Sequence, residues 1–112
     1  MRTTYGRLVR DKIPEIIRAH GAVPVIRVLS DDEFVKELKK RLIEEAWEAH
    51  YADGVALVEE CADIFEVMAW MMRARGIDPN AVFTMAEARR GERGGFSERA
   101  FLVEVEEGVV VA

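Results

Sequence analysis

Residues 61–72 read CADIFEVMAWMM, and this stretch decides the fold because it is too apolar for a helix at the protein surface. Apart from Cys61, its only ionisable side chains are Asp63 and Glu66. Its apolar residues point in nearly every direction around a helix axis, and a helix that is hydrophobic all round is buried all round. One partner helix within the chain cannot cover it. We therefore expect a helical bundle that further subunits complete, as a homo-oligomer (dimer or tetramer).

Glycines, prolines and capping residues divide the rest of the chain into helices. Asp11 is expected to cap a short helix that carries Pro14 in its first turn and stops near Gly21. Three longer helices are expected, from a capping box at Ser30 and Glu33 to about Ala52, from about Val55 to Arg75 before Gly76, and from Asp78-Pro79 to just before Gly94.

Two short segments are predicted to be strands. Residues 23–29 are rich in β-branched side chains and follow Gly21, and residues 101–105 are the second candidate. Paired, they form a small two-stranded β-ribbon. The expected fold class is therefore mainly α, with two long antiparallel helices plus shorter helices, completed by oligomerisation, in a single domain over residues 1–112.

Composition argues against several classes of protein. The 112 residues carry 21 acidic and 16 basic side chains, for a net charge of −5, and this balance argues against a dedicated nucleic-acid binder. The single cysteine permits no internal disulfide. The first residues lack the apolar core of a signal peptide, and no stretch approaches the ~20 apolar residues of a membrane-spanning helix. We expect a cytoplasmic protein with neither nucleic acid nor membrane as a partner.

Acidic residues cluster on the two long helices that should pack together. One helix carries Glu44-Glu45-x-x-Glu48, and the other carries Glu60-x-x-Asp63. Residues three apart lie on one helical face, so each pair can converge on one point. Facing pairs of this kind build carboxylate metal sites inside helical bundles.

An ordinary solvated face is the alternative for any one of these glutamates, and Glu37, Arg41 and Glu44 fit such a salt-bridged stripe. Glu45 does not fit it, because at about 100° per residue it falls on the apolar side of its helix. Burying several like charges without a counter-ion is costly, and no lysine or arginine lies in residues 61–72. A divalent cation is the simpler answer. Oxygen-only ligands favour Mg²⁺, with Mn²⁺ as a substitute.

A carboxylate-held Mg²⁺ points to phosphoryl chemistry, because this ion shares its shell with substrate phosphates. Glu44 is the candidate to orient or deprotonate an attacking water, although it also fits the surface stripe. Arg89 and Arg93 share a helical face and are candidates for a phosphate clamp; complementing the helix dipole is the alternative. Arg10 and Lys12 form a second small basic group with a similar alternative.

Together, the two carboxylate motifs resemble the signature of the MazG-type all-α nucleoside triphosphate pyrophosphohydrolases. These include house-cleaning enzymes, dimeric dUTPases and phosphoribosyl-ATP pyrophosphohydrolases. The start, LVRDKIPE at residues 8–15, and the end, RGGF at residues 93–96, look like the short phosphoribosyl-ATP-pyrophosphohydrolase-like branch. The likeness to the histidine-biosynthesis members is weaker, because the basic N-terminal segment belongs to the other branch.

The resemblance implies a role for each candidate residue. The implied Mg²⁺ ligands are Glu45, Glu48, Glu60 and Asp63, and the residue that assists the water is Glu44. The implied phosphate contacts are Arg10, Lys12, Arg89 and Arg93. The implied reaction cuts a nucleoside triphosphate between the α- and β-phosphates, in dimers or tetramers whose subunits share helices.

Several functions are compatible with this resemblance. Removal of non-standard or surplus nucleotides is the leading interpretation, and a phosphoribosyl-ATP or dUTP specialist is the alternative among enzymes. Outside enzymes, the chain would be a helical oligomerisation module or a nucleotide-sensing subunit without turnover. Intact carboxylates at all five positions argue against a chain that keeps the fold without turnover, because an inactive relative would be free to lose them.

Overall fold

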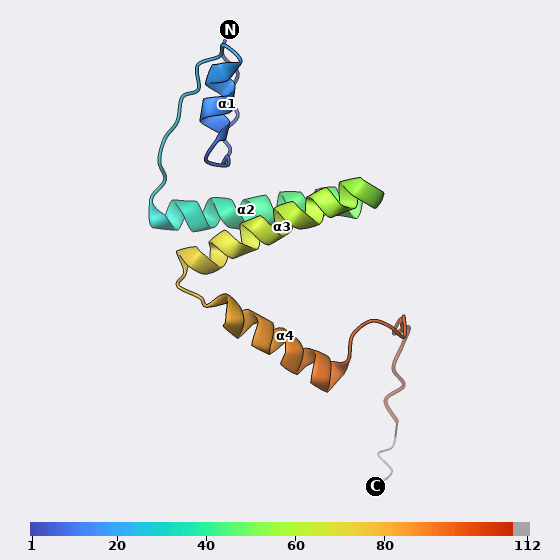
Figure 1. The fold of residues 1–112 in the computed structure, drawn as a ribbon. Coiled ribbons are helices and arrows are strands. Elements are labelled where there is room, and N and C mark those ends of the chain that lie inside the picture. The colour runs from blue at the N-terminus through green and yellow to red at the C-terminus, as the bar shows by residue number, and fades with distance from the viewer. Residues whose placement is uncertain (109–112) are drawn as a thin grey trace. The chain divides into compact units, whose positions relative to one another are not determined.

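The computed structural model describes residues 1–108, and every regular element within them is an α-helix (Figure 1). The helices are α1 (Ile13–Ala19), α2 (Asp31–His50), α3 (Gly54–Ala74) and α4 (Pro79–Arg93). The mainly α fold class is therefore confirmed. The chain divides into two compact units, Met1–Pro79 and Asn80–Ala112. Helices α1 to α3 belong to the first, and a single domain over the whole chain stays a prediction.

The start of α2 is fixed by the predicted capping box. Ser30 Oγ accepts a hydrogen bond from Glu33 N at 3.3 Å, and Glu33 Oε1 accepts one from Ser30 N at 3.2 Å. Arg27 Nη1 lies 2.9 Å from Glu33 Oε2. These contacts, the Ser30 N–H first, lower the pKa of Glu33. Because they satisfy N–H groups that a helix start leaves open, the helix begins directly after Ser30.

The end of α3 is fixed by Gly76, as expected. Gly76 has a φ of +65°, a left-handed conformation that residues with a Cβ rarely adopt. Ile77 N donates to Met72 O at 2.8 Å, and Gly76 N donates to Arg73 O at 3.2 Å. This is the bonding pattern of a Schellman motif, and the chain leaves the helix within one residue of the predicted end.

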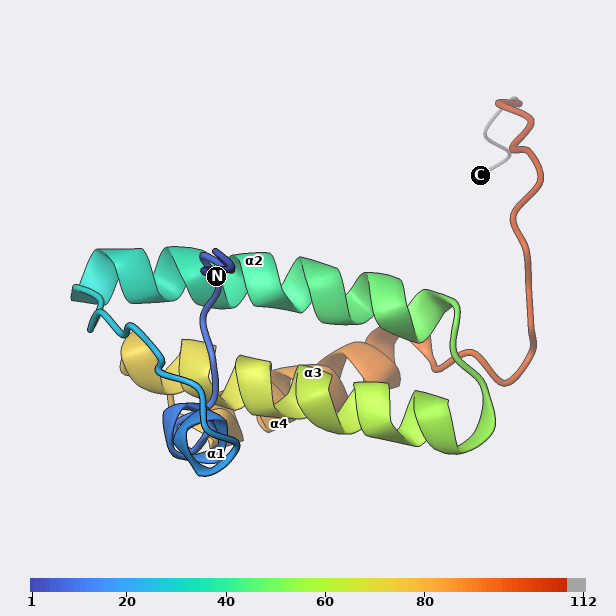
Figure 2. The same cartoon turned by 90° about the horizontal axis from the view of Figure 1, so that it is seen from above.

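Helices α2 and α3 are antiparallel and lie side by side, joined by residues 51–53 (Figures 1 and 2). The predicted pair of long antiparallel helices is confirmed. Val35 and Leu38 of α2 and Val67 of α3 are the apolar side chains that are buried among the described residues. The hairpin therefore has a thin core, and the facing sides of its two helices decide where the carboxylates meet.

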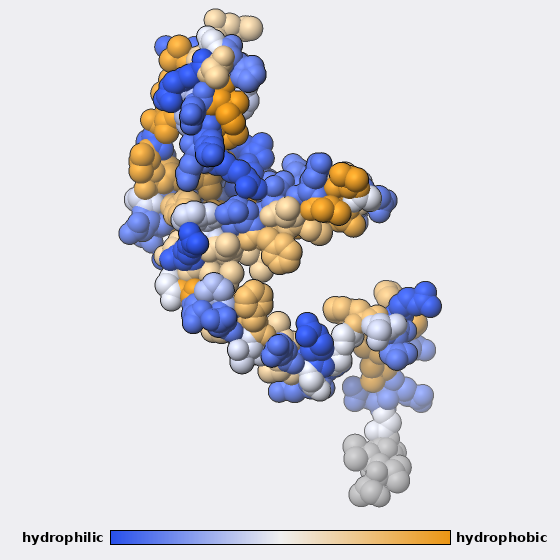
Figure 3. Space-filling view, in the orientation of Figure 1, coloured by the Kyte–Doolittle hydropathy of each residue, from blue (hydrophilic) through white to orange (hydrophobic). Residues whose placement is uncertain are grey.

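Much of the apolar surface of this hairpin is exposed in the single chain. Val67 is the buried member of residues 61–72, whereas Phe65 is 70% exposed. Trp47 and Val58 are also mostly exposed, and Figure 3 shows apolar side chains at the end of the hairpin where α2 turns into α3. Even so, none of the helices within residues 1–108 has the length and apolar character needed to cross a lipid bilayer.

The predicted β-ribbon is wrong for the part of the chain that the structure describes. Residues 23–29 and 101–105 both run without strand pairing. Pro24 has no N–H to donate to a ladder, and Val23 and Val25 are exposed. β-branched residues favour an extended backbone, but a strand also needs a partner for its N–H and C=O groups.

Helix α1 begins later than predicted, and Asp11 does not cap it. Lys12 occupies the N-cap position, and no side chain there accepts a hydrogen bond from the helix. Ile13 N instead donates to Arg10 O at 3.0 Å, so the backbone satisfies an N–H group that we expected Asp11 to bind. Pro14 lies in the first turn, as predicted.

Candidate metal centre

Three carboxylates converge between α2 and α3. Glu45 comes from α2, and Glu60 and Asp63 come from neighbouring turns of α3. One oxygen of each residue lies within 4.8 Å of the other two. Glu45 is 2% exposed, and Glu60 and Asp63 are half-buried. The predicted position of Glu45 on the buried side of its helix is confirmed, and these three residues are called the carboxylate cluster below.

Two arginines partly neutralise the carboxylate cluster. Arg41 Nη2 lies 2.9 Å from Glu45 Oε1, and Arg10 Nη2 lies 2.7 Å from Asp63 Oδ1. By contrast, Glu45 Oε2 and Glu60 Oε2 are buried and have no hydrogen-bond partner within residues 1–108. A buried carboxylate oxygen without a partner is costly, so a proton or a cation at these two atoms would stabilise the cluster.

Burial and crowding raise the pKa of two of these glutamates. The pKa of Glu60 rises to about 7, first because burial removes water from its carboxylate, and then through hydrogen bonding and repulsion involving Glu45 and Glu48. Burial also raises the pKa of Glu45, against the opposing effect of Arg41. Glu45 Oε2 and Glu60 Oε2, which are unpartnered within residues 1–108, can bond to each other only when a proton is on one of them, because ionised carboxylates only accept hydrogen bonds. Near neutral pH, the metal-free cluster therefore holds a proton for part of the time.

The donor set of the cluster fits a small, hard cation. Carboxylate oxygens are the ligands that Mg²⁺ and Mn²⁺ prefer in proteins. With metal–oxygen distances of about 2.1 Å, two oxygens on an octahedral ion are about 3.0 Å apart when adjacent and about 4.2 Å apart when opposite. Only one pair of the three oxygens can be opposite, so the 4.8 Å limit on their separations exceeds the required spacing by about 0.6 Å for that pair and by at most about 1.8 Å for the others, a gap that side-chain rotation would close on binding. An ion there would also give both unpartnered oxygens a positive neighbour.

The other two glutamates of the α2 motif lie beside the cluster rather than in it. Glu48 is exposed, and its charge contributes to the raised pKa of Glu60, so it lies close to that carboxylate. Glu44 is half-exposed, and Arg7 Nη2 lies 3.8 Å from its Oε2. Glu48 is not among the residues whose oxygens converge, so its role as a ligand stays a prediction, whereas Glu44 faces the space between α2 and the N-terminal segment.

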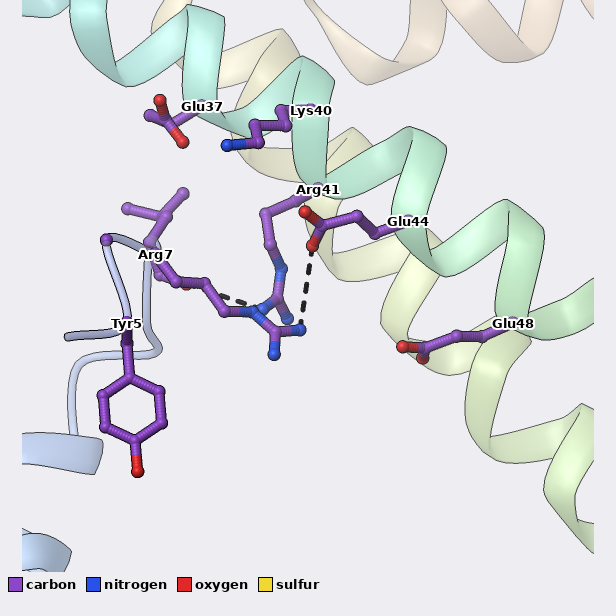
Figure 4. A pocket seen from close by; sticks show the side chains of 9 residues that line it. Tyr5, Arg7, Glu37, Lys40, Arg41, Glu44 and Glu48 are labelled. Carbon is purple, nitrogen blue, oxygen red and sulfur yellow. Dashed lines mark hydrogen bonds and ion pairs between the residues drawn. The ribbon is translucent and has the colours of Figure 1, made fainter. Parts of the chain in front are cut away.

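That space is a pocket of about 290 Å³ between residues 5–8 and α2 (Figure 4). Glu44 and Glu48 line it together with three basic side chains, those of Arg7, Lys40 and Arg41. Figure 4 shows Arg7 extending from the N-terminal segment toward Glu44 on the helix. Basic groups beside a carboxylate cluster suit a ligand that brings both phosphates and a divalent ion.

The predicted phosphate-binding residues fall in different parts of the chain. Arg10 reaches the carboxylate cluster through Asp63. Lys12 is exposed at the start of α1. Arg89 and Arg93 are exposed on α4, which lies in the other compact unit. The structure thus brings Arg10 together with the cluster, and a phosphate contact by any of these four residues stays a prediction.

Two arginines near the cluster were missed by the sequence analysis. Arg41 was assigned to a surface stripe, but its side chain is only 18% exposed and pairs with Glu45. The four-residue spacing from Arg41 to Glu45 is a signal for this pair. Arg7 offers no such signal, because it contacts Glu44 from a distant part of the sequence.

Comparison with known proteins places the part of the chain that contains α2 and α3 in one family. Residues 26–90 match the family described as phosphoribosyl-ATP pyrophosphohydrolase. A protein of Mycolicibacterium smegmatis (strain ATCC 700084 / mc(2)155), described as an uncharacterized protein, is 57% identical over 48 residues. That alignment covers 43% of this chain and 49% of the relative, about half of its length. No solved structure matches the chain. The family match contains all five predicted carboxylates but neither Arg7 nor Arg10.

Proposed function

Because the chain belongs to the phosphoribosyl-ATP pyrophosphohydrolase family, we propose that it hydrolyses a nucleoside triphosphate to the monophosphate and pyrophosphate. The family is one of the MazG-type all-α pyrophosphohydrolases, so its activity is the hydrolysis of an acid anhydride in a nucleotide. In the proposed reaction, water supplies a hydroxyl group, the bond between the α- and β-phosphates breaks, and pyrophosphate leaves. The convergence of Glu45, Glu60 and Asp63 within 4.8 Å is the observation that carries the proposal.

The proposed ligands of Mg²⁺ are the three residues of the carboxylate cluster, with Glu48 as the fourth. Mn²⁺ is the expected substitute. When bound, the ion offsets charge on phosphate oxygens and lowers the pKa of a bound water. Support comes from the buried oxygens Glu45 Oε2 and Glu60 Oε2, which have no hydrogen-bond partner within residues 1–108. The two arginines beside the cluster pair with other oxygens, Arg41 with Glu45 Oε1 and Arg10 with Asp63 Oδ1.

Glu44 is the proposed base. It lies on the pocket side of α2, half-exposed, where it is able to accept a proton from a water molecule that approaches the substrate. Arg7 Nη2 lies 3.8 Å from Glu44 Oε2, which is too far for a hydrogen bond. This oxygen therefore remains accessible to a water molecule. The basic side chains of the same pocket would hold phosphate oxygens in reach of this water. Arg89 and Arg93 remain proposed phosphate contacts on the strength of the family resemblance alone.

The proposed substrates are non-standard or surplus nucleotides, as in house-cleaning enzymes. The family match specifically favours phosphoribosyl-ATP as the second candidate, and dUTP is a further alternative. The non-enzyme alternative is a helical module that binds nucleotide or drives oligomerisation without turnover. The pocket beside the carboxylates supports an enzyme over a module whose role is assembly alone.

We also propose that the active form is a homo-oligomer, a dimer or tetramer. Exposed apolar side chains on both helices of the hairpin support it, among them Trp47, Val58 and Phe65. A helix with this much apolar surface is covered in a stable soluble protein, and a second copy of the same hairpin is a cover of matching length. A cytoplasmic location stays a prediction.

The test is a panel of nucleotides incubated with the purified protein and Mg²⁺. The panel contains standard, oxidised and uracil-containing triphosphates as well as phosphoribosyl-ATP, and the products are scored as pyrophosphate or orthophosphate. We expect pyrophosphate from at least one nucleotide. Orthophosphate with a diphosphate product would refute the bond specificity, and no turnover of any nucleotide would favour the binding module.

Variants of the cluster connect this activity to the site. Asp63→Asn and Glu45→Gln keep the side-chain shape but remove a metal-binding charge, so we expect activity to fall by orders of magnitude. Glu59→Gln is the matched control, because Glu59 is exposed on α3 directly before Glu60. Activity near wild type in either cluster variant would remove that residue from the proposed metal shell.

A further inference from the structure

A short segment before α1 bridges both helices of the hairpin. Residues 7–10, called the strap here, contact α2 twice and α3 once. Arg7 Nη2 lies 3.8 Å from Glu44 Oε2, and Leu8 O accepts a hydrogen bond from Arg41 Nη1 at 3.5 Å. Arg10 Nη2 lies 2.7 Å from Asp63 Oδ1. The strap lies outside the residues that match the family, so the family match does not account for these contacts.

The two arginines that neutralise the carboxylate cluster are held very differently. Arg41 lies within α2, four residues from its partner Glu45, and its side chain is 18% exposed. Arg10 lies on the strap, which has no regular secondary structure, and its side chain is 53% exposed. Removing Arg10 from Asp63 therefore moves one exposed side chain, whereas removing Arg41 from Glu45 would strand a buried charge.

Arg10 pairs with a carboxylate that a cation in the cluster would also use. Its guanidinium already makes a short, charge-assisted bond to Asp63 Oδ1. An ion bound by that oxygen would lie within a few ångströms of the guanidinium and repel it. Both positive groups are therefore in competition for one carboxylate, and the exposed, strap-borne group is the one that is free to leave.

We infer that Arg10 of the strap pairs with Asp63 only while no divalent ion is bound there. When the ion binds Asp63, it displaces Arg10 and releases the strap. This inference rests on the proposed metal site and adds to it. Once released from Asp63, Arg10 stays near the site, where the phosphates of a nucleotide bound to the ion would arrive. Arg10 is thus a positioning residue that stabilises Asp63 without metal and becomes available to the substrate with metal.

The direct test measures Mn²⁺ affinity without nucleotide, from the electron paramagnetic resonance signal of the free ion. Arg10→Gln removes the competitor, so we expect Mn²⁺ to bind about two- to fivefold more tightly than to wild type, the range for an exposed ion pair. Arg10→Lys should fall between them. Arg18→Gln is the matched control, because it removes the same charge from an exposed arginine of α1 and should bind as wild type does.

The second test follows the strap itself by limited trypsin digestion and mass spectrometry of wild-type protein. We expect Mn²⁺ to speed cleavage after Arg7 and Arg10, relative to cleavage after Arg99 in the other compact unit. Unchanged cleavage, or unchanged or weaker Mn²⁺ binding by Arg10→Gln, overturns the strap inference and leaves the proposed hydrolase intact. A wild-type protein that binds no Mn²⁺ overturns both.

Discussion

Metal affinity should depend steeply on pH, because Glu60 must lose a proton before it binds an ion. Its pKa is raised to about 7, so its ionised fraction is about 1/11 at pH 6, 1/2 at pH 7 and 10/11 at pH 8. The raised pKa means that protons compete with the metal on the acidic side. We therefore expect affinity for Mn²⁺ to rise about fivefold from pH 6 to pH 7 and less than twofold from pH 7 to pH 8.

Proton release gives an independent measure of the same linkage. Metal binding should expel about 0.9 proton at pH 6, about 0.5 at pH 7 and about 0.1 at pH 8. Isothermal titration calorimetry with Mn²⁺, repeated in buffers of different ionisation enthalpy, reports both the affinity and this number. The proton belongs to the cluster as a whole, because Glu45 and Glu48 share in raising the pKa of Glu60.

Two variants decide whether Glu60 is the group whose ionisation causes the pH dependence of Mn²⁺ affinity. Glu60→Gln should bind Mn²⁺ weakly and lose the pH dependence between pH 6 and pH 8. Glu59→Gln, with its change at an exposed neighbouring position, should retain both the affinity and its pH dependence. An affinity that stays constant from pH 6 to pH 8 in wild type would refute the reasoning, as would an unchanged pH profile in Glu60→Gln.

Three further predictions concern stability and assembly. Ser30→Ala removes the cap of α2 and should lower the free energy of unfolding by about 1 kcal/mol in urea titrations; Ser97→Ala, in an exposed turn, should lower it much less. Glu60→Gln should raise the melting temperature in metal-free buffer at pH 8, because the cluster loses a charge that no arginine neutralises; a lower melting temperature would contradict this. Phe65→Lys should reduce the oligomer mass measured by light scattering, since Phe65 is exposed in the single chain; Val23→Lys, outside the helices, should not.

The helices could be predicted from the sequence because their ends are decided by residues a few positions apart. The capping box joins Ser30 to Glu33, and the Schellman motif joins Gly76 to Arg73. Both motifs depend on local geometry, which short sequence patterns encode directly. The strand prediction failed for the same physical reason in reverse. Residues 23–29 have the local preference for extended structure but no strand partner within residues 1–108.

The carboxylate cluster was predictable only in part. The spacing of Glu60 and Asp63 places both on one face of α3, and antiparallel packing brings that face to α2, so convergence followed from periodicity. The ion pair of Arg10 with Asp63 spans 53 positions in the sequence, and no periodic pattern encodes such a contact. The contact between Arg10 and Asp63 depends on the path that the chain takes through α1 and the turn before it.

The counter-charges of the cluster explain how it can be stable with and without a divalent ion. In the metal-free protein, Arg41 neutralises Glu45 and Arg10 neutralises Asp63, and below a pH of about 7 a proton on Glu60 removes the third charge. Arg41 is mostly covered within α2, and we expect it to remain paired with Glu45 in both states. On the proposed function, the ion replaces one proton and one guanidinium, which together carry the same charge as Mg²⁺. Filling the site therefore leaves its net charge unchanged, so we expect the hairpin to accept the metal without repacking.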